Sequence, residues 1–232
     1  MKAVILAGGE GQRLLPYTAS FPKPMMPVGN KPILELITKQ LKAGGIEEIL
    51  IATGYMEEVI RSYFGDGTQF GIPIRYSREE KPLGTAGPLS LVRQHLREPF
   101  VVINGDILTD IDLKAFIERH RTSSHDVTLG LVSRQQQIDF GVVRLDAQGM
   151  FDAWDEKPVL DYLVSMGIYV MNPNVLALLP GNTFLNLPDF VVSVSQAGLP
   201  IGSYVHQGYW LDIGRREDYE RACRDAESLC LW

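Results

Sequence analysis

Residues 3–14 read AVILAGGEGQRL, an apolar run that passes directly into a turn with three glycines and one arginine. A short continuous apolar run is consistent with a buried strand. Glycine-rich turns after a first strand often hold phosphate groups, because their backbone N–H groups can approach an anion closely. Taken alone, a turn of this kind is more often only a tight turn, so its function has to be decided from the rest of the chain.

The turn does not match the two common nucleotide-binding patterns. In Gly-x-Gly-x-x-Gly, Leu14 stands where the third glycine belongs, and the proline-rich residues 21–29 supply no acidic strand end ~20 residues later. The chain also lacks the Gly-Lys-Ser/Thr of a P-loop. A Rossmann oxidoreductase is therefore disfavoured, as is a P-loop enzyme.

The next segment, FPKPMMPV at 21–28, places Lys23 between two prolines. Proline fixes its own φ and disfavours helix in the residue before it, so we predict an extended backbone at Lys23. A cation on a stiff segment holds its position at low entropic cost. A proline-rich connector with a solvated lysine is the alternative.

The first half of the chain alternates apolar strands with amphipathic helices. This pattern predicts an α/β fold with a mostly parallel, Rossmann-like sheet covered by helices on both faces. The expected strands are Ala3–Ala7, Glu48–Thr53, Ile72–Tyr76 and Phe100–Asn104, and the expected helices are Pro32–Ala43, Met56–Phe64, Ala86–Leu96 and Leu113–Arg121.

The second half predicts a β-rich insertion on this body. Short strands are expected at Asp126–Ser133, Gly141–Leu145, Met150–Asp155 and Ser165–Met171, with a hairpin turn at 146–149. The chain then returns through Ile201–Val205 and ends in a charged helix from about Arg215.

Composition excludes several classes. The net formal charge of −6 disfavours a nucleic-acid binder, whereas the four basic residues and one acidic residue of segment 1–31 suit a small anion. No apolar run approaches the ~20 residues of a membrane span, and the first residues are typical of a strand rather than a signal peptide. Cys223 and Cys230 are too few for a disulfide scaffold and make a poor zinc site. We therefore predict a cytoplasmic protein with no membrane partner.

Two further aspartates follow apolar runs. Asp106 comes directly after the predicted strand at Phe100–Asn104, and ligands gather at the carboxyl ends of such strands. Asp212 follows the apolar residues of YWLDIG at 209–214. One or two carboxylates plus substrate phosphates are a typical magnesium site, although an aspartate before a turn is often only a helix cap.

Ordered motifs along nearly the whole chain resemble the sugar-1-phosphate nucleotidylyltransferases, the nucleotide-sugar pyrophosphorylases. Gly9, Gly11, Arg13 and Leu14 match the family pattern Gly-x-Gly-x-Arg-Leu, and Lys23-Pro24-Met25 follows about ten residues on. The match continues through PLGTAGPL (82–89), VVINGDIL (101–108), DFGVV (139–143), DEKP (155–158) and YWLDIG (209–214).

The resemblance implies a nucleotide-diphospho-sugar transferase fold in a single domain, 1–232. Its nucleotide-binding part would cover about 1–125, its β-rich sugar-binding part 126–200, and its return to the core 201–232. The implied nucleotide contacts are Leu6, Ala7, Gly8, Gly9, Gly11, Arg13, Glu80, Gly84 and Thr85. Many relatives add a left-handed β-helix; the absence of hexapeptide repeats here predicts none.

The resemblance also implies the chemistry. Such enzymes join an NTP and a sugar 1-phosphate into an NDP-sugar and pyrophosphate. Asp106 and Asp212 would hold Mg²⁺, Arg13 and Lys23 would contact the phosphates of the nucleotide, and Lys157 would orient the sugar phosphate. Glu156 would bind a sugar hydroxyl, and Gly141 would let the sugar approach the backbone. The implied catalytic residues are thus Arg13, Lys23, Asp106 and Lys157.

The base and the sugar are less defined. Guanine presents adjacent N–H donors that suit a carboxylate, and the segment before PLGTAG carries Glu79 and Glu80 but no glutamine. GTP with a mannose- or heptose-type sugar 1-phosphate is therefore favoured. Thymidylyl or uridylyl transfer to glucose 1-phosphate or an amino-sugar 1-phosphate stays open. So do a non-catalytic nucleotide-sugar sensor of the same fold and a homodimeric assembly.

Overall fold

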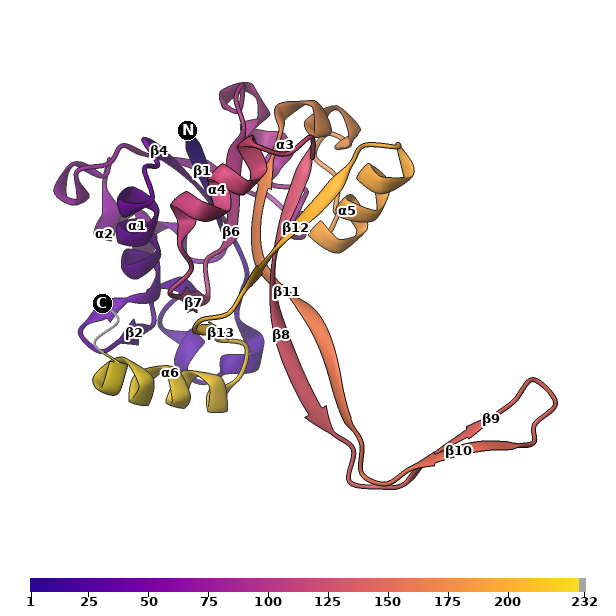
Figure 1. Ribbon diagram of the computed structural model, residues 1–232. Helices are drawn as coiled ribbons and strands as arrows, with labels where there is room; N and C mark the ends of the chain where they lie inside the picture. The colour runs from indigo at the N-terminus through magenta and orange to yellow at the C-terminus, as the bar shows by residue number, and fades with distance from the viewer. Residues whose placement is uncertain (230–232) are drawn as a thin grey trace.

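The computed structural model describes residues 1–229, so the prediction for Cys230 lies outside the described residues. A seven-stranded sheet forms its centre in the order β12-β8-β11-β6-β1-β4-β5 (Figure 1). β11 runs antiparallel to both neighbours, whereas the other pairs are parallel. This confirms the predicted mostly parallel sheet. Its strands are β1 (Lys2–Ala7), β4 (Glu48–Thr53), β5 (Ile74–Arg78), β6 (Phe100–Asn104), β8 (Val127–Gln137), β11 (Val159–Met171) and β12 (Ile201–His206).

Helices cover both faces of the sheet because the side chains of each central strand alternate between two buried clusters. Ala3 and Ile5 of β1 belong to one cluster, and Val4 belongs to the other. Residues of α1 and α4 lie in the first cluster, and residues of α3 and α5 lie in the second. The helices are α1 (Ile33–Ala43), α2 (Glu57–Phe64), α3 (Leu89–Val92), α4 (Leu113–Arg121), α5 (Leu187–Gln196) and α6 (Arg216–Leu229).

Among the helices and central strands of the body, three differ most from the sequence prediction. The expected helix Ala86–Leu96 shortens to α3 and a 3-10 turn at Arg93–His95, because it starts only after Gly87-Pro88. The strand expected from Ile72 begins at Ile74, beyond Pro73. Helix α5 was not predicted, although Pro188 lies in its first turn and Leu187, Phe190 and Val194 share its buried face.

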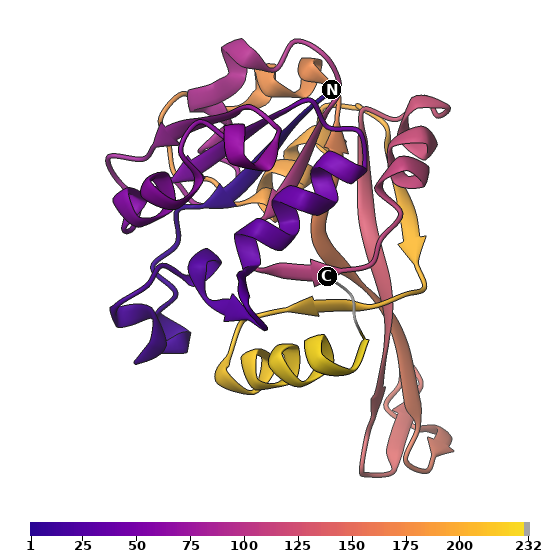
Figure 2. The same cartoon turned by 90° about the vertical axis from the view of Figure 1, so that its left-hand side faces the viewer.

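Short elements bring distant parts of the chain to the carboxyl edge of the sheet. β7 (Ile107–Thr109) pairs antiparallel with β13 (Trp210–Asp212), and β2 (Pro27–Val28) pairs with β3 (Lys31–Pro32). In Figure 2, β7, β13 and α6 lie one after another below the sheet. Short 3-10 turns cover Gln12–Leu14, Tyr17–Ala19, Lys23–Met25, Thr68–Phe70 and Pro173–Leu178.

The β-rich insertion is an arm rather than a compact layer. β8 and β11 extend past the sheet as a two-stranded ribbon, and β9 (Val142–Leu145) pairs with β10 (Phe151–Asp155) at its far end (Figure 1). We call residues 133–165 the arm. The expected strands Asp126–Ser133 and Ser165–Met171 are therefore parts of the longer strands β8 and β11. These two strands go on pairing with each other beyond the body. The prediction of a single domain stays a prediction.

Within the described residues, no helix is both long and apolar enough to span a membrane.

The β8–β11 pairing shifts register between Ser165 and Tyr169, and Gly167 within this bulge supports a first prediction. Gly167 has a φ of +71°, and an added Cβ would lie 2.5 Å from Asn104 Nδ2. Gly149, with a φ of +83° and open space around it, is the matched control. We expect Gly149→Ala to cost about 1 kcal/mol from backbone conformation alone. Gly167→Ala should cost about 2–4 kcal/mol, because a close contact adds to the same strain. Chemical denaturation measures both values, and equal losses would contradict the packing at Gly167.

Candidate active site

A cavity of about 790 Å³ opens where β1, β4 and β6 end. Ligands gather at this edge in open parallel sheets. Its walls carry the cationic side chains of Arg13 and Lys23 and the backbone of the glycine turn. The structure brings together here every residue predicted to contact a nucleotide, namely Leu6, Ala7, Gly8, Gly9, Gly11, Arg13, Glu80, Gly84 and Thr85.

The glycines of the turn are needed for close backbone packing. A Cβ on Gly8 would lie 2.3 Å from Glu79 Oε1, and one on Gly54 would lie 2.8 Å from the Gly8 carbonyl oxygen. Gly11 adopts a φ of +65°, which side-chain-bearing residues rarely do. The loops after β1 and β4 therefore meet backbone to backbone and form the floor of the cavity.

Lys23 and Asp106 form an ion pair across this floor. The Lys23 ammonium donates to Asp106 Oδ2, and the two side chains are 13% and 23% exposed. The predicted extended backbone at Lys23 is wrong, because Lys23 begins a 3-10 turn after an extended Pro22. The Met26 N–H donates to the Lys23 carbonyl at 3.1 Å, which fixes the turn that aims the side chain.

Asp212 lies beside this pair because β13 pairs with β7. Asp212 lies opposite Ile107, and the Ile213 N–H donates to the Asp106 carbonyl at 3.0 Å. Burial, and then the negative charge of Asp106, raises the pKa of Asp212; Lys23 and Arg13 oppose this shift. The charges of Asp106, Lys23 and Arg13 therefore all act on Asp212 at the cavity floor.

The two aspartates fit a magnesium ion. Asp106 Oδ1 is buried and has no hydrogen-bond partner among the described residues, while Lys23 holds the other oxygen. No group of three or more His, Cys, Asp or Glu residues within 1–229 could hold a metal. An ion between Asp106 and Asp212 would therefore take its remaining ligands from phosphates and water, as Mg²⁺ commonly does.

A second cavity of about 430 Å³ adjoins the first and shares Thr85 and Asn104 with it. Its walls combine polar and aromatic side chains with the apolar Met166, Leu187 and Pro188, and Asp212 lies at one side. Sequence reasoning missed most of its lining, including the side chains Asn104, Tyr169, Asn186, Asp189 and Trp210.

Asn104 is the most informative of these residues. It stands two residues before Asp106 at the carboxyl end of β6, and its Oδ1 is buried without a partner among the described residues. Burying an unsatisfied oxygen is costly, so such an atom calls for an explanation. Its position at the end of an apolar strand, beside a predicted site aspartate, was the signal that could have found it.

The two glutamates before PLGTAG take different positions. Glu79 is half-buried and accepts the Leu83 N–H at 2.8 Å, while Glu80 is exposed at the cavity wall. Burial raises the pKa of Glu79, and the hydrogen bond from Leu83 opposes the shift. Glu79 thus supports the loop, whereas the Glu80 side chain is open to solvent at the cavity wall.

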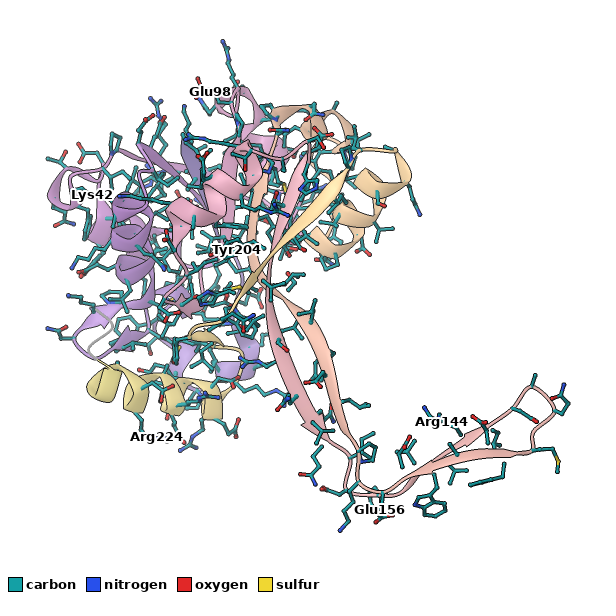
Figure 3. The ribbon with its side chains drawn as sticks, viewed as in Figure 1. Lys42, Glu98, Arg144, Glu156, Tyr204 and Arg224 are labelled. Carbon is teal, nitrogen blue, oxygen red and sulfur yellow. The ribbon has the colours of Figure 1, made fainter. Side chains whose placement is uncertain are left out.

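Gly141, Glu156 and Lys157 are not brought to either cavity. All three belong to the arm, and Figure 3 shows Glu156 at its bend, far from the body. Trp154 donates its indole N–H to Glu156 at 3.1 Å, and its ring packs against Gly141. The long β8–β11 ladder carries these residues away from the ends of β1 and β6.

Comparison with known proteins agrees with this architecture. Residues 2–228 match the family model described as nucleotidyl transferase. A mannose-1-phosphate guanylyltransferase from Mycobacterium tuberculosis is 37% identical over 96% of this chain, and a UTP–glucose-1-phosphate uridylyltransferase from Synechocystis sp. is 34% identical over 97%. HddC from Yersinia pseudotuberculosis, solved in complex with GMP-PN, superposes with a TM-score of 0.73 at 26% identity, covering 97% of this chain and 98% of that one. The chain spans 64% and 63% of the lengths of the two enzymes named first.

The burial of Glu79 predicts a pH-dependent contribution to stability. Because its folded pKa is raised above the unfolded value, this residue stabilises the fold at low pH, and the contribution is lost as pH rises through the folded pKa. Glu79→Gln keeps an acceptor for Leu83 and removes the charge. We expect the variant to gain unfolding free energy relative to the original chain as pH rises from about 4.5 to 7.

Glu80→Gln is the matched control, since it removes the same charge from an exposed side chain. Denaturant titrations across this pH range measure all three proteins. A Glu79→Gln difference that stays constant with pH would contradict the buried carboxylate.

Proposed function

This chain belongs to the nucleotidyl transferase family, and from that premise we propose that it transfers a nucleotidyl group from an NTP to a sugar 1-phosphate, releasing pyrophosphate. One observation carries the proposal: the charged cluster of Arg13, Lys23, Asp106 and Asp212 lies where two cavities join. The larger cavity offers glycine backbone and cations to a triphosphate. The smaller offers polar and aromatic side chains to a sugar.

The reaction is a displacement at the α-phosphorus. A sugar-phosphate oxygen attacks this phosphorus, a new phosphorus–oxygen bond forms, and the bond to the β-phosphate oxygen breaks with loss of pyrophosphate. The nucleophile needs no general base, because a phosphate monoester has a second pKa near ~6 and is mostly dianionic at neutral pH. Alignment and charge neutralisation therefore supply the catalysis.

The charged residues where the two cavities join have separate proposed roles. Arg13 would bind the β- and γ-phosphates and stabilise the departing pyrophosphate. Lys23, held by Asp106, would lie between the nucleotide phosphate and the incoming phosphate. Magnesium bound by Asp106 and Asp212 would neutralise phosphate charge and polarise the α-phosphate. Lys157 is proposed to hold the phosphate of the sugar, although it lies in the arm.

The sugar would occupy the second cavity. Asn104 Oδ1 can accept a hydrogen bond from a sugar hydroxyl, which would satisfy the buried oxygen. Trp210 offers its ring to the apolar face of a sugar, and Asp189 offers a further acceptor. A mannose- or heptose-type sugar 1-phosphate is the proposed substrate, supported by the guanylyltransferase relative.

GTP is the proposed nucleotide. The exposed Glu80 carboxylate at the cavity wall suits the adjacent N–H donors of guanine. UTP or dTTP is the alternative, favoured by the similarity to a uridylyltransferase. A non-catalytic sensor is a second alternative, but it would have no need of the complete set of Arg13, Lys23, Asp106 and Asp212. Cytoplasmic location stays a prediction from cysteine usage.

A pyrophosphate-release screen tests the function directly. Four NTPs are paired with a panel of sugar 1-phosphates in the presence of Mg²⁺. We expect the highest rate with GTP and a mannose- or heptose-type sugar 1-phosphate. Nucleotide binding without release from any pair would establish the sensor instead.

Arg13 provides the sharpest test of the catalytic assignment. We expect Arg13→Ala to lower kcat by about 10²–10³, because an electrostatic contact to the leaving group is lost. Arg119→Ala removes an equal charge from the exposed side of α4 and should leave kcat unchanged. Steady-state kinetics measure kcat for both variants. Near-normal turnover of Arg13→Ala would contradict the assignment of Arg13 to the leaving pyrophosphate.

Glu80 tests the choice of base. Loss of a hydrogen bond to a charged group costs about 1.5–3 kcal/mol, so Glu80→Gln should lower the ratio of kcat/KM for GTP to that for UTP by about 10-fold or more. Glu79→Gln, the same substitution at the neighbouring loop-supporting residue, should leave the ratio within about twofold. If the ratio of kcat/KM for GTP to that for UTP is unchanged in Glu80→Gln, Glu80 does not recognise guanine.

A further inference from the structure

At its root Val164 packs against the core, but beyond this root the arm lies clear of the rest of residues 1–229 (Figure 1). β12 pairs with β8 only as far as Val132, and β6 pairs with β11 only from Ile168 onward. Between these points, residues 133–165 form a ribbon of two strands, and none of them is buried. An isolated two-stranded ribbon is at best marginally stable in water, so this arm needs a surface to lie against.

One face of the terminal hairpin is apolar. Val143 lies opposite Trp154, and Leu145 opposite Phe151, so these four side chains share a face and are 44–66% exposed. Arg144 and Asp155 form an ion pair within the hairpin. Ten of the eighteen exposed large hydrophobic side chains among the described residues lie in the arm. An exposed apolar face of this kind marks a contact surface.

The root of the arm lies at the second cavity, where Ser165 is part of the wall, and the rest of the arm extends outward from there (Figure 1). Arg134 donates to the Trp210 carbonyl at 3.0 Å and stacks over the Trp210 ring, while the Trp210 indole N–H donates to the Met166 carbonyl at 3.0 Å. From there the ladder runs without a break from Ser133 and Leu163 to Gln137 and Val159. Figures 1 and 2 both show the hairpin well clear of the body.

Exposed apolar surface indicates what the arm would meet. Leu15, Tyr17 and Phe21, which we call the cavity rim, follow the glycine turn of the larger cavity in the sequence and are 60%, 40% and 54% exposed. Lys157 lies in the arm and lines neither cavity of its own chain. The apolar face of the hairpin is thus complementary to the cavity rim of a second copy.

We propose that two copies of this chain exchange arms, so that the hairpin of each copy lies on the cavity rim of the other and delivers Lys157 and Glu156 to it. The assignment of Lys157 to the sugar phosphate rests on the proposed function. A two-fold axis makes both contacts identical and closes the assembly as a dimer. Each active site is then composite: Arg13, Lys23, Asp106 and Asp212 come from one copy, and Lys157 comes from its partner.

Complementation between two inactive variants tests the exchange. Lys157→Ala has an intact cavity and a defective arm, and Arg13→Ala has a defective cavity and an intact arm. With exchanged arms, a mixed dimer purified through two different tags contains one intact site. It should therefore recover about half of the original rate per dimer. If each arm serves its own cavity, the mixed dimer shows only the residual rates of its parents, and the proposal is overturned.

A second mixed dimer, made from two cavity variants, controls for activity that returns without arm exchange. Arg13→Ala and Asp106→Asn both damage the cavity, so their mixed dimer contains no intact site and should stay at the residual rates. Recovery in this control would show that chains re-sort or that contamination supplies the activity. Normal turnover by Lys157→Ala alone would also overturn the delivery of this residue in trans.

Oligomeric state gives a readout independent of turnover. We expect a mass of twice 25.9 kDa by light scattering, and a shift to a monomer when Phe151 and Trp154 are both changed to serine. Circular dichroism and the binding of GTP by this variant check that the body remains folded. A monomeric original chain, or a dimer that survives the double change, overturns arm exchange. If the original chain dimerises through the arm but transfers no nucleotide, the proposed function fails while the interface stands.

Discussion

The ion pair between Lys23 and Asp106 is the constraint on which the rest of the site depends. It joins the loop after β1 to the end of β6, and it holds one carboxylate oxygen while leaving the other without a partner among the described residues. Breaking a largely buried pair leaves an uncompensated charge, which makes the geometry of this floor costly to change. Asp212 adds a second carboxylate only because β13 pairs with β7.

Much of this arrangement could be predicted from local sequence. The apolar runs at β1, β4 and β6 have one buried environment on each face, so their pattern specifies strands without knowledge of the fold. The residues of the glycine turn, Lys23 and Asp106 follow the ends of such strands and therefore meet at one edge. Asn104 and Asp189 were missed because their importance arises from the wall of the second cavity, which α5, β11 and β13 form together.

The position of the arm could not be predicted from local sequence patterns. The sequence indicated a strand that begins at Gly141 and strands on both sides of Lys157, but the alternation of side chains along a ribbon does not reveal where a third strand stops pairing. β12 and β6 leave β8 and β11 at Val132 and Ile168, and this tertiary feature decides whether the hairpin covers its own body. The same limit applies to Lys23, whose proline neighbours suggested an extended backbone and whose turn is set by hydrogen bonds to the residues that follow.

The position of attack on the nucleotide decides whether this chain is a nucleotidyl transferase in its chemistry. Incubating the protein with mannose 1-phosphate and GTP that carries radioactive phosphate at either the α or the γ position identifies the phosphorus that is attacked. We expect the α label to pass into a sugar nucleotide and the γ label to leave in pyrophosphate. Transfer of the γ label to the sugar, or release of the α label as free GMP or GDP alone, would contradict this expectation.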